Sequence, residues 1–307
     1  MPISPSITVR LALVYNPVSG SGAGERAADR AWAALERRGH VVDARPTSEA
    51  VATAEIARRA AATTERMIAM GGDGTVTDVA AGILAAGGRV PLAVVPAGTA
   101  NILALNLGIP DALDAAIDLA VGGRIAPIDV GRVNGEVFLL TVSTGLHAEM
   151  VARADRESKR RWGVAAYGMA GWKANQEVEP ARHRVTCDGV NEEFEVTMMQ
   201  VMNCGAVFRR AWELAPGISP IDGRLDVLAY RAASIPEYML AATQVLRGAP
   251  TTTDLVEHRR AVRVTIATDP PVRVQRDGEP AGHTPVEIDL LPLALPVVMP
   301  PDGPWVR

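Results

Sequence analysis

Continuous apolar runs recur over the first 125 residues of the chain. Residues 9–15 and 90–95 are apolar at nearly every position, and residues 41–44 and 67–70 form shorter runs of the same kind. A strand that is buried on both faces of a parallel sheet has this pattern, whereas a strand with one solvated face alternates apolar and polar positions. We therefore predict a buried parallel strand at each run.

Segments with helical spacing separate these runs. We expect a helix over residues 25–38 and another over residues 79–86. Thr47 or Ser48 can cap a further helix that ends near residue 62, and two more begin near residues 101 and 111. The first helix places four side chains on its apolar face: Ala28, Ala31, Trp32 and Leu35. Alternation of strands and helices predicts a doubly wound parallel α/β domain.

After residue 124 the strand-like runs follow one another without regular helices. Asn-Gly and Asp-Gly pairs separate many of them, as in hairpins, so we predict an antiparallel β-sandwich domain. Helices are expected to interrupt it over residues 148–173 and 235–248. The predicted domains are residues 1–125, rejoined by the tail 292–307, and residues 126–291. A cleft between two such halves is a usual place for an active site. The predicted strands are residues 128–133, 136–142, 182–187, 193–203, 225–230, 261–267, 272–275 and 286–290.

Composition narrows the class of protein. The 307 residues are enough for two domains, and the net charge of −4 without a basic stripe argues against a nucleic-acid partner. Cys187 and Cys204 fit no metal-binding spacing and are read as buried thiols in a reducing compartment. Because we find no leader pattern and no apolar run of about 20 residues, we expect a cytoplasmic protein.

The stretch with the most chemical information is a glycine-rich turn between a predicted strand and a predicted helix. It reads Gly71-Gly72-Asp73-Gly74-Thr75. Glycines let backbone N–H groups approach a phosphate closely. Asp73 would repel a bare phosphate, so it fits only a site where it meets a metal, a hydroxyl proton or a ribose hydroxyl. Phosphoryl transfer from a nucleotide is the reaction class that uses both features.

Several other nucleotide sites are excluded. The chain has two lysines, Lys159 and Lys173, and neither follows a glycine loop in the Walker A pattern or lies in the strand motif of protein kinases. The glycines at positions 20, 22 and 24 have the wrong spacing for a dinucleotide-binding turn.

Three loops of the phosphate-binding type follow three predicted strands, at residues 16–24, 71–75 and 96–101. Loops at the carboxyl ends of parallel strands line one crevice, and Thr47 also follows a strand. This ordered set resembles the diacylglycerol kinase catalytic-domain family, which includes sphingosine kinases and bacterial lipid kinases and shares its fold with NAD kinases. The resemblance covers nearly the whole chain. It also includes Leu214-Ala215-Pro216, Asp222-Gly223-Arg224-Leu225-Asp226 and Asp277-Gly278-Glu279.

The resemblance implies a role for each matching residue. Asp277 and Glu279 match the family's catalytic carboxylates: one would accept the proton of a lipid hydroxyl and the other would help to hold Mg²⁺. Asp73 is the rival base. A divalent ion is implied at Asp222, with backbone oxygens near Ser219 and Arg224. The positions that match ATP-contacting residues are Asn16, Thr47, Gly71, Gly72, Asp73, Gly74, Thr75 and Thr99.

Each assignment has a structural alternative. Asp277-Gly278 and Asp222-Gly223 are also ordinary hairpin turns, and Thr47 can be a helix cap. Asp129 is read equally as an active-site neighbour or as a residue of a turn at the end of a strand. The chain departs from the family's usual residues at Thr77-Asp78, at His147 and at Arg209-Arg210, and the last two departures leave the identity of the acceptor open.

The function implied is an ATP- and Mg²⁺-dependent lipid kinase, with diacylglycerol as the leading acceptor and phosphatidic acid as its product. The alternatives are another acceptor (a sphingoid base, another lipid alcohol or a soluble NAD-like molecule) and a catalytically silent lipid-binding homologue. Basic residues from Arg153 to Arg161 precede Trp162, Tyr167 and Trp172, which suits peripheral contact with an anionic membrane at its inner face, although a solvated basic face is the alternative. The oligomeric state, including a homodimer, stays open.

Overall fold

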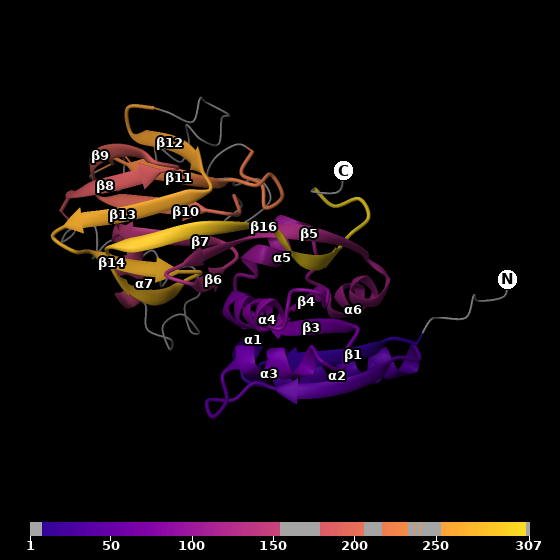
Figure 1. The fold of residues 1–307 in the computed structure, drawn as a ribbon. Helices are drawn as coiled ribbons and strands as arrows, with labels where there is room; N and C mark the ends of the chain where they lie inside the picture. The colour runs from indigo at the N-terminus through magenta and orange to yellow at the C-terminus, as the bar shows by residue number, and fades with distance from the viewer. Residues whose placement is uncertain are drawn as a thin grey trace. The chain divides into compact units, whose positions relative to one another are not determined.

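The structure, a computed structural model, describes residues 8–153, 179–205, 217–232, 237, 240 and 253–304. The chain forms two compact units: Met1–Ile128 with Leu293–Arg307, and Asp129–Pro292 (Figure 1). The first unit is an α/β layer structure and the second is built from antiparallel sheets. The predicted fold class is therefore confirmed.

The first unit is built on parallel strands in the order β2-β1-β3-β4, with the C-terminal part of β16 beside β4 through the pair Val297 and Leu92. The strands are short and, except for β2 at the exposed edge, almost wholly buried, as their apolar runs predict. Their bounds are β1 (Arg10–Tyr15), β2 (Val41–Pro46), β3 (Arg66–Gly71), β4 (Leu92–Pro96) and β16 (Val286–Met299).

Helices cover both faces of this sheet (Figure 1). Helices α2 and α6 pack on one face, where Leu35 and Ile117 join Leu13 and Ile68 in one apolar core. Helices α3 and α4 pack together and contact the strands β1, β3 and β4. The helix bounds are α1 (Ser19–Gly22), α2 (Gly24–Arg37), α3 (Thr53–Ala60), α4 (Asp73–Ala85), α5 (Ile102–Leu107) and α6 (Leu113–Gly122).

Three local predictions for this unit are wrong. Trp32 is 42% exposed rather than part of the buried face, because the alanines of that face already pack closely on the sheet. Helix α3 begins at Thr53 after Ala52, so Thr47 and Ser48 do not cap it. The helix predicted from residue 79 begins at Asp73, directly after the N-cap Gly72, so most of the glycine-rich stretch is the first turn of α4.

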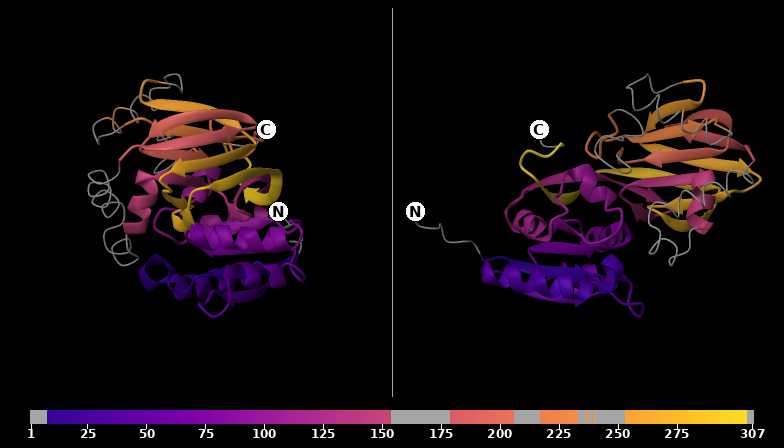
Figure 2. Two further views of the ribbon diagram at one scale, coloured as in Figure 1. Left: turned by 60° about the vertical axis from the view of Figure 1, so that its left-hand side comes forward. Right: turned by 180° about the vertical axis from the view of Figure 1, so that it is seen from behind.

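The second unit contains two antiparallel sheets, which Figure 2 shows stacked face to face. One has the order β16-β13-β8-β9 and the other β12-β11-β10-β7-β14-β15. Strand β5 (Arg124–Val133) leads into this unit and pairs with β6. The other elements are β6 (Glu136–Phe138), β7 (Thr141–Gly145), α7 (Leu146–Arg153), β8 (Ala181–Cys187), β9 (Val190–Val196), β10 (Met198–Met202), β11 (Leu225–Tyr230), β12 (Val256–Ala261), β13 (Arg263–Asp269), β14 (Arg273–Arg276) and β15 (Glu279–His283).

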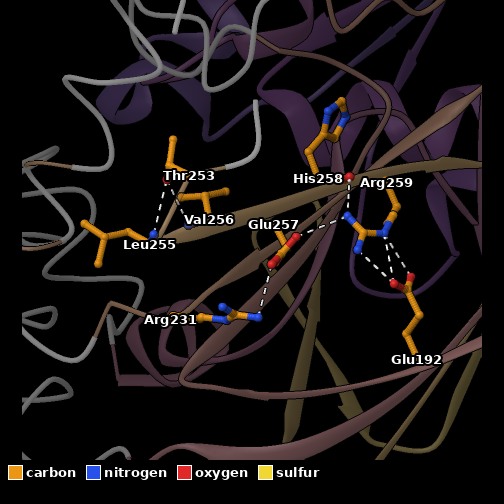
Figure 3. Close-up of polar contacts among 8 residues, drawn as sticks. All are labelled: Glu192, Arg231, Thr253, Leu255, Val256, Glu257, His258 and Arg259. Atoms are coloured by element: carbon orange, nitrogen blue, oxygen red, sulfur yellow. Dashed lines mark hydrogen bonds and ion pairs between the residues drawn. The ribbon is translucent and has the colours of Figure 1, made fainter. Parts of the chain in front are cut away.

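The facing sides of the two sheets form the core of the sandwich, with Val201 and Val227 from one sheet and Phe194 and Ile266 from the other among its residues. A polar network links the edge strands β12 and β9 (Figure 3). The guanidinium of Arg259 donates to both carboxylate oxygens of Glu192, at 2.8–3.1 Å, and lies 5.9 Å from the centre of the Phe194 ring. Arg259 also pairs with Glu257 at 3.2 Å.

Three predicted strands turn out to cover parts of two strands that lie in different sheets. The run 193–203 is divided at Thr197, where the chain passes from β9 in one sheet to β10 in the other. The run 136–142 is divided between β6 in the first sheet and β7 in the second, and the run 261–267 contains only the last residue of β12, Ala261, before it continues as β13. Each run looks continuous because the residues on both sides of the crossing face the same core.

Some predictions fall outside the described residues. They include nearly all of the basic and aromatic segment from 153 to 172, the departures at Arg209 and Arg210, and the Leu214-Ala215-Pro216 motif. Of the helix predicted over residues 148–173, the structure describes α7 up to Arg153. The helix predicted over residues 235–248 also lies mostly outside the described part.

Candidate active site

The nucleotide-type loops of the first unit follow one another along one edge of its sheet. The backbone N–H of Thr47 donates to the carbonyl of Tyr15 at 2.8 Å, and that of Asn16 donates to Met70 at 3.0 Å. Ala97 continues the series with a 3.0 Å bond to Gly71. The parallel ladder thus extends into the loops after β2, β1, β3 and β4. The structure brings together the loops that carry the sequence-predicted nucleotide residues of this unit.

The loop after β3 and the loop after β4 meet backbone to backbone. A Cβ built on Gly98 would lie 2.4 Å from the Cα of Gly72, so only glycine fits at position 98. A Cβ on Gly71 would lie 2.6 Å from the hydroxyl oxygen of Thr75. Internal packing therefore explains both glycines without any ligand.

Internal packing does not explain why position 74 is a glycine. A Cβ at this position would meet no atom within 4 Å, and the residue is exposed in the first turn of α4. The first N–H groups of a helix have no partner inside the helix, and they favour anions. The open space at Gly74 therefore leaves this helix end accessible to a phosphate.

The carboxylate of Asp73 is turned toward the neighbouring helix α5. Its two oxygens accept the N–H groups of Ile102 and Leu103, each at 3.0 Å. Burial raises the pKa of Asp73, while these backbone hydrogen bonds oppose the rise. Because both oxygens are engaged, Asp73 fastens the start of α5 to the start of α4.

The remaining candidate residues of this unit differ in their exposure and in the hydrogen bonds that their side chains form within the protein. The side-chain oxygen of Asn16 accepts the N–H of Val18 at 3.0 Å, as in an Asx turn. Thr99 is exposed, and Thr75 is half-buried. The Thr47 hydroxyl is half-buried and has no hydrogen-bond partner in the described part of the chain.

In the second unit, Asp277 and Gly278 form the two-residue turn between β14 and β15. Both have positive φ, at 47° and 83°, as a tight hairpin turn requires. One oxygen of the Asp277 carboxylate accepts the N–H of Leu139 at 2.8 Å. The other accepts those of Leu140 at 2.9 Å and Thr141 at 3.0 Å. Asp277 therefore ties this turn to the start of β7.

Glu279 differs from the other two candidate carboxylates. It is the first residue of β15, its side chain is exposed, and its carboxylate has no hydrogen bond or ion pair with the described residues. Of Asp73, Asp277 and Glu279, it alone has a carboxylate that is not taken up by backbone amides. Of the three carboxylates, it is the one most open to a molecule outside the chain.

The loop before β11, where a divalent ion is implied, is closed by internal contacts. One oxygen of Asp222 accepts the N–H of Arg224 at 3.1 Å, and the other is paired with the guanidinium of Arg260. The hydroxyl of Ser219 accepts the N–H of Ile221 at 3.3 Å. Burial raises the pKa of Asp222, and Arg260 opposes the rise. The buried carboxylate of Asp129 accepts the N–H of Gly223 at 2.7 Å and so holds this turn.

This arrangement does not fit Mg²⁺ at the Asp222 side chain, because Arg260 already supplies the positive charge there. Among the described residues, no three side chains of the His, Cys, Asp or Glu types are grouped to hold a metal. A divalent ion at this loop stays a prediction, and it requires Arg260 to release Asp222. Arg260 was missed at the sequence level because its strand is polar and gives no apolar run.

The structure also locates the two positions in the described residues at which the chain departs from the family's usual residues. Thr77 is buried and Asp78 exposed in α4. His147 lies in the first turn of α7, 2.9 Å from the hydroxyl of Ser143 and 3.4 Å from the amide nitrogen of Gln275. Gln275 was not singled out from the sequence, yet its side-chain oxygen accepts the N–H of Gly278 at 2.8 Å. An isolated glutamine in a strand gives no signal of such a role.

The first unit has open loops of the phosphate-binding type, and the β unit has an exposed acid on a tight turn. Together these features define the class of a two-domain phosphotransferase. Residues 10–133 match the family model of the diacylglycerol kinase catalytic domain, and residues 140–299 match the YegS C-terminal NAD kinase beta sandwich-like domain. The chain belongs to this diacylglycerol kinase family, and it is an ATP-dependent lipid kinase.

Individual relatives match this chain along most or nearly all of its length. A diacylglycerol kinase of Bacillus subtilis is 30% identical over 95% of this chain and 96% of its own length. A protein of Citrobacter koseri named "Probable lipid kinase YegS-like" is 28% identical over 79% of this chain and 81% of its own. The crystal structure of a diacylglycerol kinase from Bacillus anthracis superimposes with a TM-score of 0.79 at 25% identity, and covers 95% of this chain and 97% of that one.

The described helices include none that is both long enough and apolar enough to cross a membrane.

Proposed function

We propose that this kinase transfers the γ-phosphate of ATP to the free hydroxyl of diacylglycerol, giving phosphatidic acid and ADP. The observation that carries the proposal is the difference among the three candidate carboxylates. Asp73 and Asp277 are engaged by backbone N–H groups, whereas Glu279 is exposed and unengaged within the described residues. An alcohol is a poor nucleophile until a nearby base takes its proton, and Glu279 is available for that task.

In this proposal the domain of residues 1–125, with the tail 292–307, binds the nucleotide. The exposed first turn of α4 at Gly74 and Thr75 donates N–H groups to phosphate oxygens. The hydroxyls of Thr47 and Thr99 and the loop that follows Asn16 supply further contacts. Gly71 and Gly72 shape the loop that presents this helix end, and Asp73 keeps α5 in place beside it.

The β domain of residues 126–291 supplies the base and binds the acceptor. The Glu279 carboxylate takes the proton of the acceptor hydroxyl while the hydroxyl oxygen forms a bond to the γ-phosphorus. The bond between that phosphorus and the oxygen bridging to the β-phosphate breaks, and ADP leaves with the electron pair. Asp277 positions the turn through its hydrogen bonds to the start of β7. Mg²⁺ bound to the phosphate oxygens of ATP would neutralise part of the charge that the transfer moves.

Diacylglycerol is favoured as the acceptor because relatives along the whole chain carry that name. The protein would then act as a peripheral enzyme at the inner face of a membrane, where ATP and the lipid are both present. The segment from Arg153 to Trp172 stays the predicted contact with anionic lipid.

The test is a transfer assay with radiolabelled ATP and Mg²⁺ over a panel of acceptors. The panel contains dioleoylglycerol, a monoacylglycerol and sphingosine in mixed micelles, together with soluble NAD. We expect labelled phosphatidic acid from wild type and a loss of label in Glu279→Gln. Label on sphingosine or NAD instead would replace the acceptor, and label on none of them would refute the proposed acceptor and point to another lipid alcohol.

A further inference from the structure

A row of polar side chains crosses one face of the six-stranded sheet beside the catalytic turn. Ser143 on β7 lies directly opposite Gln200 on β10 and opposite Gln275 on β14, so the three side chains share one face. All three are buried, with exposed fractions of 1%, 5% and 0%. His147, from the first turn of α7, lies next to this row: its Nδ1 is 2.9 Å from the Ser143 hydroxyl and 3.3 Å from the Gln200 amide nitrogen.

The row connects to the turn that carries Glu279. The amide nitrogen of Gln275 donates to the Ser143 hydroxyl at 2.7 Å, and its amide oxygen accepts the N–H of Gly278 at 2.8 Å. Gly278 is the residue directly before Glu279. Helix α7 is also tied to β14 by the ion pair of Glu149 with Arg273 at 3.0 Å, which keeps the helix beside this row.

The directions of these hydrogen bonds follow from the atoms involved. A glutamine side chain has one donor end and one acceptor end, and rotating it by half a turn exchanges them. Because Gln275 uses its oxygen for Gly278, its nitrogen needs an acceptor, and the Ser143 oxygen is that acceptor. The Ser143 proton is then free to point at Nδ1 of His147, which accepts it.

We infer that Gln275 is a positioning residue for Glu279, and that Ser143 and His147 fix the direction of its amide. This inference rests on the proposed role of Glu279 as the base. When the Ser143 hydroxyl is removed, the Gln275 nitrogen loses its 2.7 Å partner and keeps only the longer 3.4 Å contact to Nδ1 of His147, so the acceptor of the Gly278 N–H is held less firmly. The carboxylate of Glu279, one residue further on, is then no longer held at one place, and a base displaced by about 1 Å can lose up to about 100-fold in rate.

The chain supplies a matched control at the next residue of the same strand. Thr144 is as buried as Ser143, but its side chain points to the opposite face, where its hydroxyl lies 3.0 Å from Nε2 of the buried His183. Ser143→Ala and Thr144→Val each remove one buried hydroxyl and one hydrogen bond to a histidine. The first change touches the row beside the turn, and the second does not.

We would measure three quantities in the full-length variants. They are the melting temperature, kcat and the KM for ATP with dioleoylglycerol in mixed micelles, and the hydrogen exchange of the peptide spanning residues 274–280. For Ser143→Ala we expect kcat to fall about tenfold, an unchanged KM for ATP, and faster exchange at Gly278. For Thr144→Val we expect a similar loss of melting temperature, with kcat and exchange at the turn like those of wild type.

A pair of histidine variants adds a rescue. Asparagine can present an oxygen near the place of Nδ1, so His147→Asn should keep more turnover than His147→Leu at similar stability. Equal kcat and equal exchange in Ser143→Ala and Thr144→Val would overturn the inference. The exchange measurement needs no activity, so it is independent of the base assignment. Wild-type turnover in Glu279→Gln would instead remove the proposed role of Glu279, whatever the exchange shows.

Discussion

Replacing Asp277 and Glu279 by their amides separates a residue that holds the turn from a residue that does the chemistry. The two side chains lie two positions apart, and each change keeps the shape of the side chain and removes its charge. Asp277 accepts three backbone N–H groups at 2.8–3.0 Å, whereas Glu279 is exposed without a partner in the described part of the chain. The two variants should therefore fail in different ways.

The magnitude for Asp277→Asn follows from its three hydrogen bonds. Asparagine has one oxygen, so its amide nitrogen must face at least one of the N–H groups of Leu139, Leu140 and Thr141. An unsatisfied buried donor costs about 1–3 kcal/mol, and the remaining bonds lose the extra strength of a charged acceptor. Because the site is only partly buried, we expect a loss of about 2–3 kcal/mol in the free energy of unfolding, or about 5–10 °C in melting temperature.

Glu279→Gln should show the reverse behaviour. A substitution at an exposed side chain changes the free energy of unfolding by less than about 0.5 kcal/mol. Turnover should fall about 100-fold or more, the scale for loss of a general base, with little change in ATP affinity. Calorimetric melting and steady-state kinetics on both variants test the pair. A stable Asp277→Asn protein, or a Glu279→Gln protein with wild-type kcat, would refute this division of roles, and the second result would make Asp73 the next candidate base.

Three further changes test other parts of the protein. Gly74→Ala should weaken ATP binding in calorimetry by about tenfold or more, because the added methyl group enters the space left for a phosphate; this is the scale of a lost charged hydrogen bond. The control is Gly122→Ala, which also lies in open space on a helix and should bind ATP normally. Arg259→Ala should lower the free energy of unfolding in urea by about 1 kcal/mol, since its pairs are partly exposed and screened; no change would mean that the network does not stabilise the sandwich edge. Arg160→Glu with Arg161→Glu should weaken sedimentation with anionic vesicles, as should added salt, and sedimentation like wild type would leave the basic run as a solvated face.

The architecture was predictable because the first part of the chain alternates apolar runs with helical spacing, whereas the second part has strand-like runs one after another. Errors occurred where tertiary structure overrides a local pattern. The run through Thr197 is continuous in hydrophobicity, and only the pairing of its two parts with different sheets shows that it is two strands. Strand β12 was missed because its residues 257–260 are polar or charged, as suits an edge strand whose ion pairs close the edge of the sandwich core.

The position of the candidate site residues in their loops could also be predicted, but their contacts could not. Asp73 meets amides 29 and 30 residues away, and Asp277 meets amides 136–138 residues away. No local spacing encodes such pairs. The same limit applies to Asp222, whose partner Arg260 lies 38 residues further on and in a different strand.

Asp73 and Asp277 use the same physical device in unrelated folds. Each acid sits next to glycine in a tight segment, and each carboxylate accepts successive N–H groups at the start of a neighbouring element, α5 in one case and β7 in the other. Both oxygens of each carboxylate are thereby used to hold a neighbouring element, and at Asp73 these hydrogen bonds oppose the rise in pKa that burial causes. An acid within a glycine-rich motif is therefore explained by the geometry of the turn as well as by catalysis. Under the proposed function, the chain uses two acids to hold its loops and leaves the exposed third, Glu279, for the proton of the acceptor.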